Sequence, residues 1–390
     1  MKNRLRAGFV VAQFLLTGGV TQFAHSQNRA PIEKKIGSYM DIAGSKIYYE
    51  QCGAGPVVVL LHDGLLHSNT WDGAWDALCK RYHTVRYDRR GYGRSTAANA
   101  RYSPVDDLYA LLKHLNVPRA VIVGNSSGGG LAIDFTLTYP EMVEGLFLIG
   151  PVVQGMDTSE HFDERVKKNM APLERNDLKA TVENWSKDVY IVAAGHDAAR
   201  KTIYSSLMES PQDLTHSFQF EIPNPVPSLY RLSEIHIPTS ILVGEFDIPD
   251  VHAQCGAIEA GIPGAQRDVL KNAGHLVQLE LPDAFTARLA RFVDLQERKG
   301  INISTEILRS YAGKYESAQM SAPIMTIELK DGQLTLQTPG AQPFPLFAES
   351  QSKFFMKVWE LKIEFVKDAS GKVVEADLNL DGAIIKAPRL

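Results

Sequence analysis

Short apolar runs of strand length recur between residues 36 and 297, and segments of helical length separate them. The run at 57–61 is apolar at every position, which is typical of a strand that is buried on both faces. The other strand-like runs are 46–49, 83–87, 120–123, 146–149, 241–243 and 269–270. Strands that alternate with helices in this way predict a mostly parallel sheet with right-handed crossovers and helices on both faces.

The helices of this region carry recognisable start signals. Ser103 and Pro104 are a good N-cap and first-turn pair, and leucines at helical spacing follow them. Further helices are predicted from about 127 to 139 and from 282 to about 296. The alternation stops between 152 and 235, where the sequence is typical of helices and loops rich in Met, Trp and Phe. We predict that this insertion covers the sheet as a helical cap.

Residues 303–390 show a different pattern, in which short strand-like runs flank turn signals. Asp331 and Gly332 separate two such runs, and this dipeptide suits the primed turns that match strand twist. Similar turn signals stand at 370–371 and 381–382. We therefore predict a small antiparallel β domain at 303–390, which a polar linker joins to a larger α/β domain at 27–300.

The first 26 residues have the pattern of an export signal. Lys2, Arg4 and Arg6 form a positive start, an apolar stretch runs from 7 to about 23, and small residues precede position 27. A membrane anchor is the alternative, but a spanning helix needs about 20 mostly apolar residues, and polar and glycine residues interrupt this stretch. We predict that 1–26 is a cleaved signal peptide and that the mature protein is periplasmic or secreted, without a membrane span.

Composition limits the partners that the chain can have. Of its 390 residues, 44% are hydrophobic and 22% are charged, which is ordinary for a globular protein with a sizeable core. The formal net charge is −4 and no basic run follows the first six residues, so a general nucleic-acid surface is not expected. Cys52, Cys79 and Cys255 leave at least one thiol unpaired in a monomer, and whether any two pair is open.

The pentapeptide at 124–128 has the glycine and serine spacing of a nucleophile elbow, and it stands between a predicted strand and a predicted helix. The sharp turn of an elbow presents its central serine, here Ser126, at the carboxyl edge of the sheet. Small residues on either side let the strand and the helix pass closely. Ser127 is a weaker nucleophile candidate, because a motif centred on it would place Asn125 where a small residue is needed.

A serine hydroxyl needs a base, and the base needs an acid that orients it and stabilises its charged form. His275 follows a glycine in the loop between the last predicted strand and the final helix of the α/β domain. Asp247 follows the strand at 241–243, so it lies at the same edge of the sheet. The chain order of nucleophile, acid and base agrees with that of nucleophile-elbow enzymes. Glu245 and Asp250 are the alternative acids, and each could be a solvated loop carboxylate.

Acyl transfer also needs two backbone N–H groups that bind the developing negative oxygen in an oxyanion hole. The N–H of Ser127 is one candidate, because it directly follows the nucleophile. The other is expected in the loop after the strand at 57–61, with Gly64 as the first choice and Leu65 as the second. Asp63 stands in this loop, where it could cap a turn or discourage anionic substrates.

Five motifs in this order resemble the α/β-hydrolase family over residues 36–297. The stretch 62–64 is similar to the family's His-Gly-X loop, with Asp63 in place of the glycine, and 88–95 is similar to its Asp-x-Arg-Gly-x-Gly-x-Ser segment. The resemblance implies an α/β-hydrolase fold. More loosely, residues 311–315 and the Asp-Gly hairpin resemble the β modules appended to some penicillin-binding-protein-like serine hydrolases.

These motifs predict two-step acyl transfer, in which Ser126 attacks a carbonyl while His275 takes its proton, and water later releases the acid. The sequence contains no metal-ligand cluster and no phosphate loop, so no metal and no cofactor are expected. The expected substrate is a small ester, thioester or lactone with an apolar acyl or aryl group. The apolar group is indicated by large apolar side chains in the cap: Met170, Trp185, Tyr204, Phe218 and Phe220. The alternative is that these side chains only pack the cap on the sheet.

Two alternatives remain. A C–C bond hydrolase of the same fold is favoured by the Gly-Asn-Ser elbow, whereas Leu276 stands where such enzymes usually carry an aromatic residue after the histidine. A non-catalytic binding protein on a hydrolase scaffold is the other alternative. The presence of a complete set of triad residues disfavours it.

Overall fold

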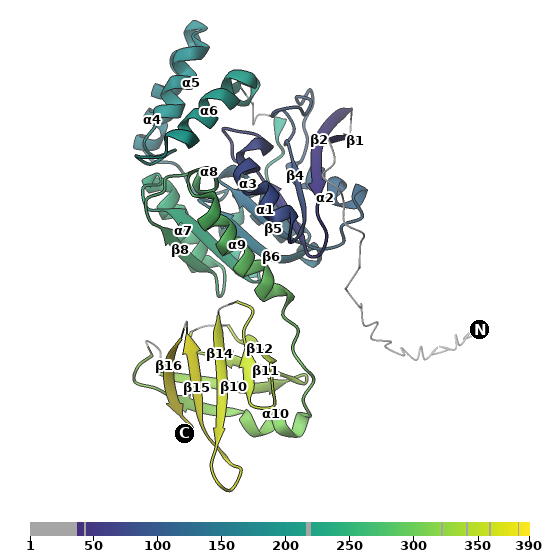
Figure 1. The fold of residues 1–390 in the computed structure, drawn as a ribbon, viewed down its shortest axis with the longest axis vertical. Helices are drawn as coiled ribbons and strands as arrows, with labels where there is room; N and C mark the ends of the chain where they lie inside the picture. The colour runs from purple at the N-terminus through teal and green to yellow at the C-terminus, as the bar shows by residue number, and fades with distance from the viewer. Residues whose placement is uncertain are drawn as a thin grey trace, which may run out of the picture.

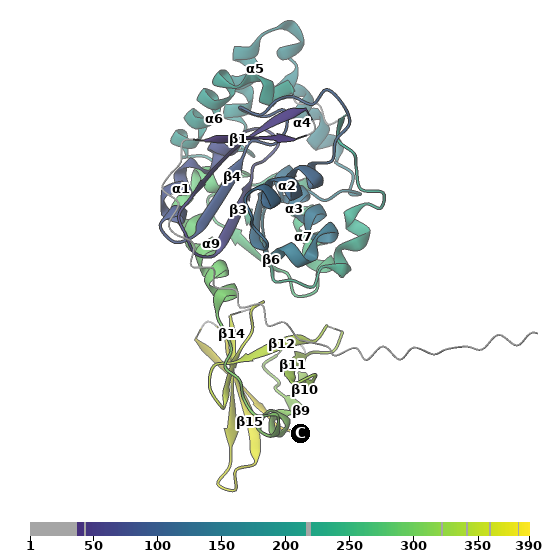
Figure 2. The same cartoon turned by 90° about the vertical axis from the view of Figure 1, so that its right-hand side faces the viewer.

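The computed structural model describes most of the chain as two parts with different architectures. The described residues are 37–42, 44–215, 220–320, 323–340, 342–358, 360–380 and 382–390. The predicted signal peptide at 1–26 lies outside them, as does Phe218. The cap helices, the large sheet and the C-terminal β domain follow one another along the long axis of the molecule (Figures 1 and 2).

The α/β domain is built on one sheet of eight strands, most of which are parallel. Its strands are β1 (Ser38–Ile42), β2 (Ser45–Cys52), β3 (Val57–Leu61), β4 (His83–Tyr87), β5 (Ala120–Asn125), β6 (Val143–Ile149), β7 (Thr239–Gly244) and β8 (Gln266–Leu270). They lie in the order β1-β2-β4-β3-β5-β6-β7-β8. Strand β2 pairs antiparallel with β1 and β4, and the other neighbours pair parallel.

Helices cover both faces of this sheet, as the alternating pattern predicts. One face carries α1 (Asp72–Cys79), α8 (Val277–Glu280) and α9 (Pro282–Glu297), and the other carries α2 (Pro104–His114), α3 (Ser127–Thr138) and α7 (Pro249–Gly261). The central strand shows why both faces are apolar: Val58 packs with the first group of helices, and Val59 packs with the second. At the start of α2, the Ser103 hydroxyl accepts the N–H of Asp106 at 3.1 Å, as its N-cap position predicts.

The segment between β6 and β7 forms a helical cap above the carboxyl ends of the parallel strands (Figure 1). Its helices are α4 (Glu160–Met170), α5 (Leu178–Lys187) and α6 (Asp197–Glu209), with shorter 3₁₀ turns at Leu173–Arg175, Pro211–Thr215 and Ser228–Glu234. Val182, Trp185 and Ile203 are buried in the same apolar cluster as the sheet face below them. The cap is therefore continuous with the core of the α/β domain.

The C-terminal part is a nearly closed antiparallel barrel. After α10 (Thr305–Tyr311) come β9 (Gly313–Glu316), β10 (Ile324–Lys330), β11 (Gln333–Gln337), β12 (Phe344–Ala348), β13 (Lys353–Phe355), β14 (Leu361–Lys367), β15 (Val373–Leu380) and β16 (Ala383–Pro388). Each strand pairs with the next, and the N–H of Leu390 donates to the carbonyl of Lys314 at 2.9 Å, which brings the two ends of the sheet together. Closure protects the strand edges from other chains. The sequence predicted the antiparallel sheet but not its closure.

The predicted hairpin turn is present at the tip of β10 and β11. Asp331 has a φ of 50° and Gly332 has a φ of 80°. Positive φ at both central residues defines the type I′ turn, whose twist matches that of the flanking strands. The paired residues Lys330 and Gln333 close the hairpin directly beside it.

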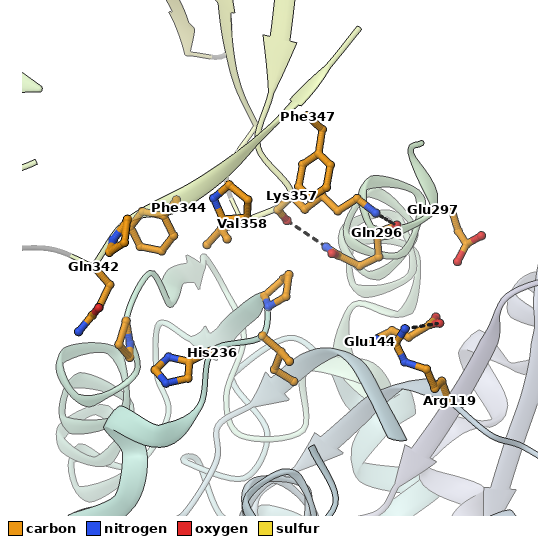
Figure 3. Close-up of a pocket in the computed structure, with 15 residues that line it drawn as sticks. Arg119, Glu144, His236, Gln296, Glu297, Gln342, Phe344, Phe347, Lys357 and Val358 are labelled. Carbon is orange, nitrogen blue, oxygen red and sulfur yellow. Dashed lines mark hydrogen bonds and ion pairs between the residues drawn. The ribbon is translucent and has the colours of Figure 1, made fainter. Parts of the chain in front are cut away.

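The β domain packs against the amino ends of the parallel strands, at the opposite end of the sheet from the cap. Arg298 and Glu349 form an ion pair at 2.9 Å, and the Lys357 ammonium donates to the Gln296 carbonyl at 2.5 Å. A cavity of about 290 Å³ remains between the two domains, with Phe344 on the β-domain side (Figure 3).

Within the described residues, no helix has both the length and the hydropathy that a membrane span requires.

The open question of cysteine pairing is resolved by the fold. Cys52, at the end of β2, and Cys79, at the end of α1, form a disulfide with their Cα atoms 5.3 Å apart. Cys255 is buried in α7 as a free thiol, and burial raises its pKa. The disulfide ties an edge region of the sheet to the helix that covers it.

Removing this disulfide is expected to destabilise the protein. The two cysteines are 27 residues apart, and closing a loop of that length lowers the entropy of the unfolded chain by an amount worth about 3–4 kcal/mol. The Cys52→Ser/Cys79→Ser variant should lose about this much free energy of unfolding in a urea titration. Reductant should lower the urea midpoint of the wild type to that of the variant and leave the midpoint of the variant unchanged. Equal urea midpoints for the wild type and the variant without reductant would contradict the pairing.

Candidate active site

The elbow places Ser126 in a strained conformation between β5 and α3. Its φ is 54° and its ψ is −120°, a backbone region that residues other than glycine rarely adopt. The conformation is held from both sides, since the N–H of Ser126 donates to the Ile149 carbonyl at 2.9 Å and its own carbonyl accepts the N–H of Gly130 at 3.1 Å. Ser126 is partly exposed, whereas Asn125 and Gly128 are buried. The nucleophile candidate therefore reaches the surface of an otherwise closed turn.

The two elbow glycines are required by close backbone contacts. A Cβ atom on Gly124 would lie 2.3 Å from the carbonyl oxygen of Gly128. A Cβ atom on Gly128 would lie 2.4 Å from the carbonyl oxygens of Leu61 and His62. The elbow helix thus packs directly on the loop after β3, which is the loop predicted to supply an oxyanion donor.

His275 and Asp247 form a buried pair at the carboxyl edge of the sheet. The imidazole Nδ1 lies 2.9 Å and 3.1 Å from the two carboxylate oxygens, and the residues are only 5% and 4% exposed. The N–H of Ile248 donates to Oδ1 of Asp247 at 2.6 Å and fixes the carboxylate. Because the carboxylate can only accept, Nδ1 carries a proton and Nε2 is left as the basic nitrogen.

The surroundings of His275 shift its pKa in opposite directions. Burial alone lowers the pKa of the imidazole, whereas the charge and hydrogen bond of Asp247 raise it, as does the nearby charge of Asp63. Arg165 in the cap lowers it. The net effect is a pKa above the ordinary value of histidine, so the carboxylates favour the imidazolium form.

Neither of the alternative acids contacts His275. Asp250 accepts the N–H and the hydroxyl of Ser159 at 2.6 Å and 2.9 Å, which ties it to the start of the cap. Glu245 accepts the N–H of Asn272 at 3.0 Å. Asp247 is the carboxylate that the structure brings to His275.

The side chain of Asn125 connects the elbow to the loop that carries His275. Its amide nitrogen donates to the carbonyls of Ile149 and His275 at 2.9 Å and 3.4 Å. Its amide oxygen accepts from Gln278 at 3.0 Å. Because Asn125 is completely buried, these bonds fix Ser126, its neighbour, relative to the histidine loop.

Glu280 is a buried acid that the sequence pattern did not predict to be part of the site. Its carboxylate accepts the N–H of Gly274 at 2.9 Å and the N–H of Ala193 at 2.7 Å. The N–H of His275 in turn donates to the carbonyl of Tyr190 at 2.8 Å. Burial raises the pKa of Glu280, while the Gly274 and Ala193 hydrogen bonds oppose that rise. Glu280 therefore positions the histidine loop against the cap, and no spacing rule in the sequence marks it.

The loop after β3 is organised by the carboxylate of Asp63. Its Oδ1 accepts the N–H groups of Leu65 and Leu66 at 2.7 Å and 2.9 Å, so Asp63 caps the turn. The N–H of Leu65, the second choice of oxyanion donor, is thereby occupied. The N–H of Gly64 has no acceptor among the described residues, and that of Ser127 begins a helix, where no intrahelical acceptor exists. Both remain available as donors.

Asp63 is almost fully buried, and its other oxygen, Oδ2, has no hydrogen-bond partner within the described part of the chain. Burial raises the pKa of this carboxyl group, and the N–H groups of Leu66 and Leu65, together with the charge of His275, oppose the rise. A carboxylate therefore stands close to the histidine in addition to Asp247.

Asp88 and Arg90 of segment 88–95 make structural contacts. The Asp88 carboxylate accepts the N–H of Ser68 at 3.0 Å, and Arg90 forms a two-point contact with Asp107 at 2.9 Å and 2.8 Å. Both acids are buried, so these contacts fix the loop between β4 and α2. Arg89, which lies between them in the sequence, contacts the Asp63 carbonyl and the Ser127 hydroxyl instead.

The apolar side chains predicted to line a substrate site lie mostly within the cap. The Trp185 indole N–H points to the sulfur of Met170 at 3.3 Å, and Tyr204 packs against the same apolar cluster. The carbonyl of Phe220 accepts the N–H of Tyr102 at 2.9 Å. These contacts support cap packing for Met170, Trp185 and Tyr204.

In the described ranges, no three His, Cys, Asp or Glu side chains gather in a way that could hold a metal.

Known proteins resemble the chain in each of its two parts. A family model described as Domain of unknown function (DUF3471) matches residues 297–387. Over the first part, the chain is 27% identical to a pimeloyl-(acyl-carrier protein) methyl ester esterase of Nitrosospira multiformis, covering 63% of this chain and 97% of that protein. It is 29% identical to a 2-hydroxy-6-oxononadienedioate/2-hydroxy-6-oxononatrienedioate hydrolase of Paraburkholderia phymatum, covering 64% and 91%.

The same part of the chain resembles solved structures of hydrolases. The structure of Est816, described as an N-acyl homoserine lactone degrading enzyme, superimposes with a TM-score of 0.54 at 25% identity, covering 65% of this chain and 100% of that one. A family model described as Alpha/beta hydrolase family matches residues 58–288. Because that match spans more than half of the chain and agrees with the sheet order and the elbow, the protein is a hydrolase that belongs to the alpha/beta hydrolase family.

Proposed function

We propose that the protein is a serine hydrolase that cleaves a carboxylic ester, thioester or lactone through an acyl-enzyme on Ser126. The observation that carries this proposal is the buried contact of Asp247 with Nδ1 of His275, at 2.9 Å and 3.1 Å, beside an elbow that exposes a serine. The similarity to a methyl ester esterase and to a lactone-degrading enzyme supports the substrate class.

In the proposed mechanism, Nε2 of His275 takes the hydroxyl proton as Oγ of Ser126 bonds to the carbonyl carbon. The negative charge moves to the former carbonyl oxygen, which the N–H groups of Gly64 and Ser127 bind. Collapse of this intermediate breaks the bond to the leaving group, which takes the proton from His275. A water molecule then gives its proton to His275 and attacks the acyl carbon, and the serine leaves with that proton. Asp247 holds the imidazole in the required tautomer throughout.

A C–C bond hydrolase is the second candidate. It is favoured by the relative named as a 2-hydroxy-6-oxononadienedioate/2-hydroxy-6-oxononatrienedioate hydrolase and by Asn125 at the elbow. Against it, the residue that follows the histidine is Leu276, which is not aromatic and is completely buried. A panel of aryl and alkyl esters, thioesters, lactones and one vinylogous 1,5-diketone distinguishes the two candidates. Turnover of the diketone alone would replace the ester proposal.

We propose that the β domain takes no part in the chemistry and that it is of the kind appended to penicillin-binding-protein-like serine hydrolases. The resemblance to those β modules is supported by the sequence at 311–315 and by the Asp331-Gly332 turn. The absence of a chemical role is supported by the position of the domain at the amino ends of the strands, opposite Ser126.

Exchange of the proposed triad residues is expected to stop turnover in folded protein. Ser126→Ala removes the nucleophile and should abolish both ester hydrolysis and labelling by a serine-directed phosphonate. Asp247→Asn removes the orienting charge and should lower kcat by about 10⁴, as the comparable change does in a serine protease. Circular dichroism checks that both variants are folded. Glu245→Gln and Asp250→Asn are the matched controls, and a loss of turnover in either of them would move the acid to that position.

The pH profile is expected to report the raised pKa of His275. The reaction needs the neutral imidazole, so kcat/KM should fall as the pH drops through that pKa, with a midpoint above the ordinary value of 6.5. Asp63→Asn removes a negative charge that favours the imidazolium, so its midpoint should move to lower pH. Asp41→Asn, at an exposed carboxylate, is the control. A midpoint that does not move in Asp63→Asn would show that this carboxyl group is uncharged over the range.

We also propose that the protein is exported. A positive and then apolar start supports this, as does the Cys52–Cys79 disulfide, because such bonds persist in oxidising compartments. The mature protein in a periplasmic or secreted fraction is expected to begin near Gln27, which N-terminal sequencing measures. A chain that begins at Met1 in the membrane fraction would support an anchor instead.

A further inference from the structure

Arg89 is a buried cation that lies between the two loops proposed to bind the oxyanion. It is only 6% exposed, and its Nη2 donates to the carbonyl oxygen of Asp63 at 2.7 Å and to the hydroxyl of Ser127 at 2.8 Å. Its guanidinium also lies over the ring of Tyr92, with Cζ 4.9 Å from the ring centroid. No carboxylate within the described ranges forms an ion pair with it. Burial of a charged side chain is costly, and an ion pair usually compensates for it. Arg89 has only a backbone carbonyl and a hydroxyl as hydrogen-bond partners, so an ion pair does not explain why it is buried.

The Asp63 carbonyl belongs to the same peptide group as the N–H of Gly64. A planar trans peptide points its carbonyl and its N–H in opposite directions, so whatever holds the carbonyl also aims the N–H. Arg89 thus acts on the first proposed oxyanion donor without touching it. Because hydrogen bonds polarise one another, a donor on the carbonyl also makes the N–H of Gly64 a stronger donor.

His62 supplies a second donor to the same carbonyl. The backbone N–H of Arg89 donates to Nε2 of His62 at 2.9 Å, so Nε2 accepts and the ring proton is on Nδ1. Nδ1 lies 2.7 Å from the Asp63 carbonyl oxygen and donates to it. The main chain of Arg89 therefore sets the tautomer of His62, and both side chains hold one carbonyl.

The other contact of Arg89 reaches the residue that carries the second proposed donor. The Ser127 hydroxyl accepts from the same Nη2 atom that binds Asp63. One nitrogen therefore ties together the two residues whose spacing decides whether an oxyanion fits between the N–H of Gly64 and the N–H of Ser127.

We propose that Arg89 is a positioning residue that sets the direction and spacing of both oxyanion donors. The proposal rests on the serine hydrolase function proposed above, and it assigns Arg89 no contact with the substrate. The donors bind charge that is present only in the tetrahedral intermediate and its transition states. Loss of Arg89 should therefore lower kcat and leave KM nearly unchanged, whereas a substrate-binding arginine would change KM.

Arg89→Met and Arg89→Lys test this in the full-length protein with p-nitrophenyl butyrate as substrate. Loss of one oxyanion donor costs about 10²–10³ in kcat, so misplacement of both should cost about 10–100-fold. Affinity for a trifluoromethyl ketone, which forms a tetrahedral adduct, should fall by a similar factor. Lysine keeps the charge but cannot hold the two acceptors in the planar geometry of a guanidinium, so it should not restore kcat.

Chemical rescue and coupling separate this role from a merely structural one. In Arg89→Ala, added guanidinium should raise kcat in a saturable manner, and the same concentration of sodium chloride should not. Ser127→Ala removes the hydroxyl acceptor and keeps the N–H, so its loss of kcat and that of Arg89→Met should be less than additive. Arg90→Lys is the matched control, because Arg90 is the adjacent buried arginine and binds Asp107 instead. It should lower the unfolding midpoint and leave kcat of the folded protein unchanged.

Wild-type kcat and inhibitor affinity in folded Arg89→Met, beside an inactive Ser126→Ala, would overturn the role of Arg89 and leave the hydrolase proposal intact. If Arg89→Met does not fold, Arg89→Lys and Ser127→Ala decide the question by the same two measurements. An active Ser126→Ala variant would overturn the hydrolase proposal and the role of Arg89 with it.

Discussion

The strained, positive-φ backbone of Ser126 is the constraint on which the rest of the α/β domain depends. A non-glycine residue with a φ of 54° costs on the order of 1–3 kcal/mol, and it persists only when the surrounding structure determines it. Here α3 packs so tightly on β5 that Gly124 allows no Cβ atom, and so tightly on the loop after β3 that Gly128 allows none either. The same tight turn brings α3 onto the loop after β3 and sets Asn125 against the histidine loop. One strained residue thus fixes the arrangement of three loops.

The sheet separates chemistry from domain packing. Parallel strands end at one edge, so the loops after β3, β5, β7 and β8 converge there with Gly64, Ser126, Asp247 and His275. The cap lies over this edge and is bonded to the histidine loop through the backbone of Tyr190 and the carboxylate of Glu280. The β barrel contacts the opposite edge, where strands begin. A shift of the cap would therefore move His275, whereas a shift of the barrel would reach the site only through the whole sheet.

The sequence predicted the features that depend on local patterns and could not predict those that depend on contacts between distant residues. Buried strands are apolar runs, and the elbow is a pentapeptide, so the fold class and the positions of Ser126 and its neighbours were accessible. The histidine–aspartate contact followed from the position of each residue in a loop after a predicted strand, together with the chain order. Glu280, Arg89 and the Cys52–Cys79 pair have no local signature, because their partners lie in segments that meet only after folding. The closure of the barrel is of the same kind.

Asp63 shows how these distant contacts compensate for one another. A carboxylate in the loop proposed to bind the oxyanion would oppose negative charge there, and its burial is itself unfavourable, since Oδ2 has no partner among the described atoms. The same residue removes Leu65 and Leu66 as competing donors by capping the turn, which leaves the N–H of Gly64 free. In the proposed role of Arg89, the positive charge of its guanidinium on the carbonyl of Asp63 opposes this electrostatic disadvantage and leaves the turn capped by Asp63 in place. Arg89 occupies that position, so a substitution of Asp63 and a substitution of Arg89 should each alter the balance that the other maintains.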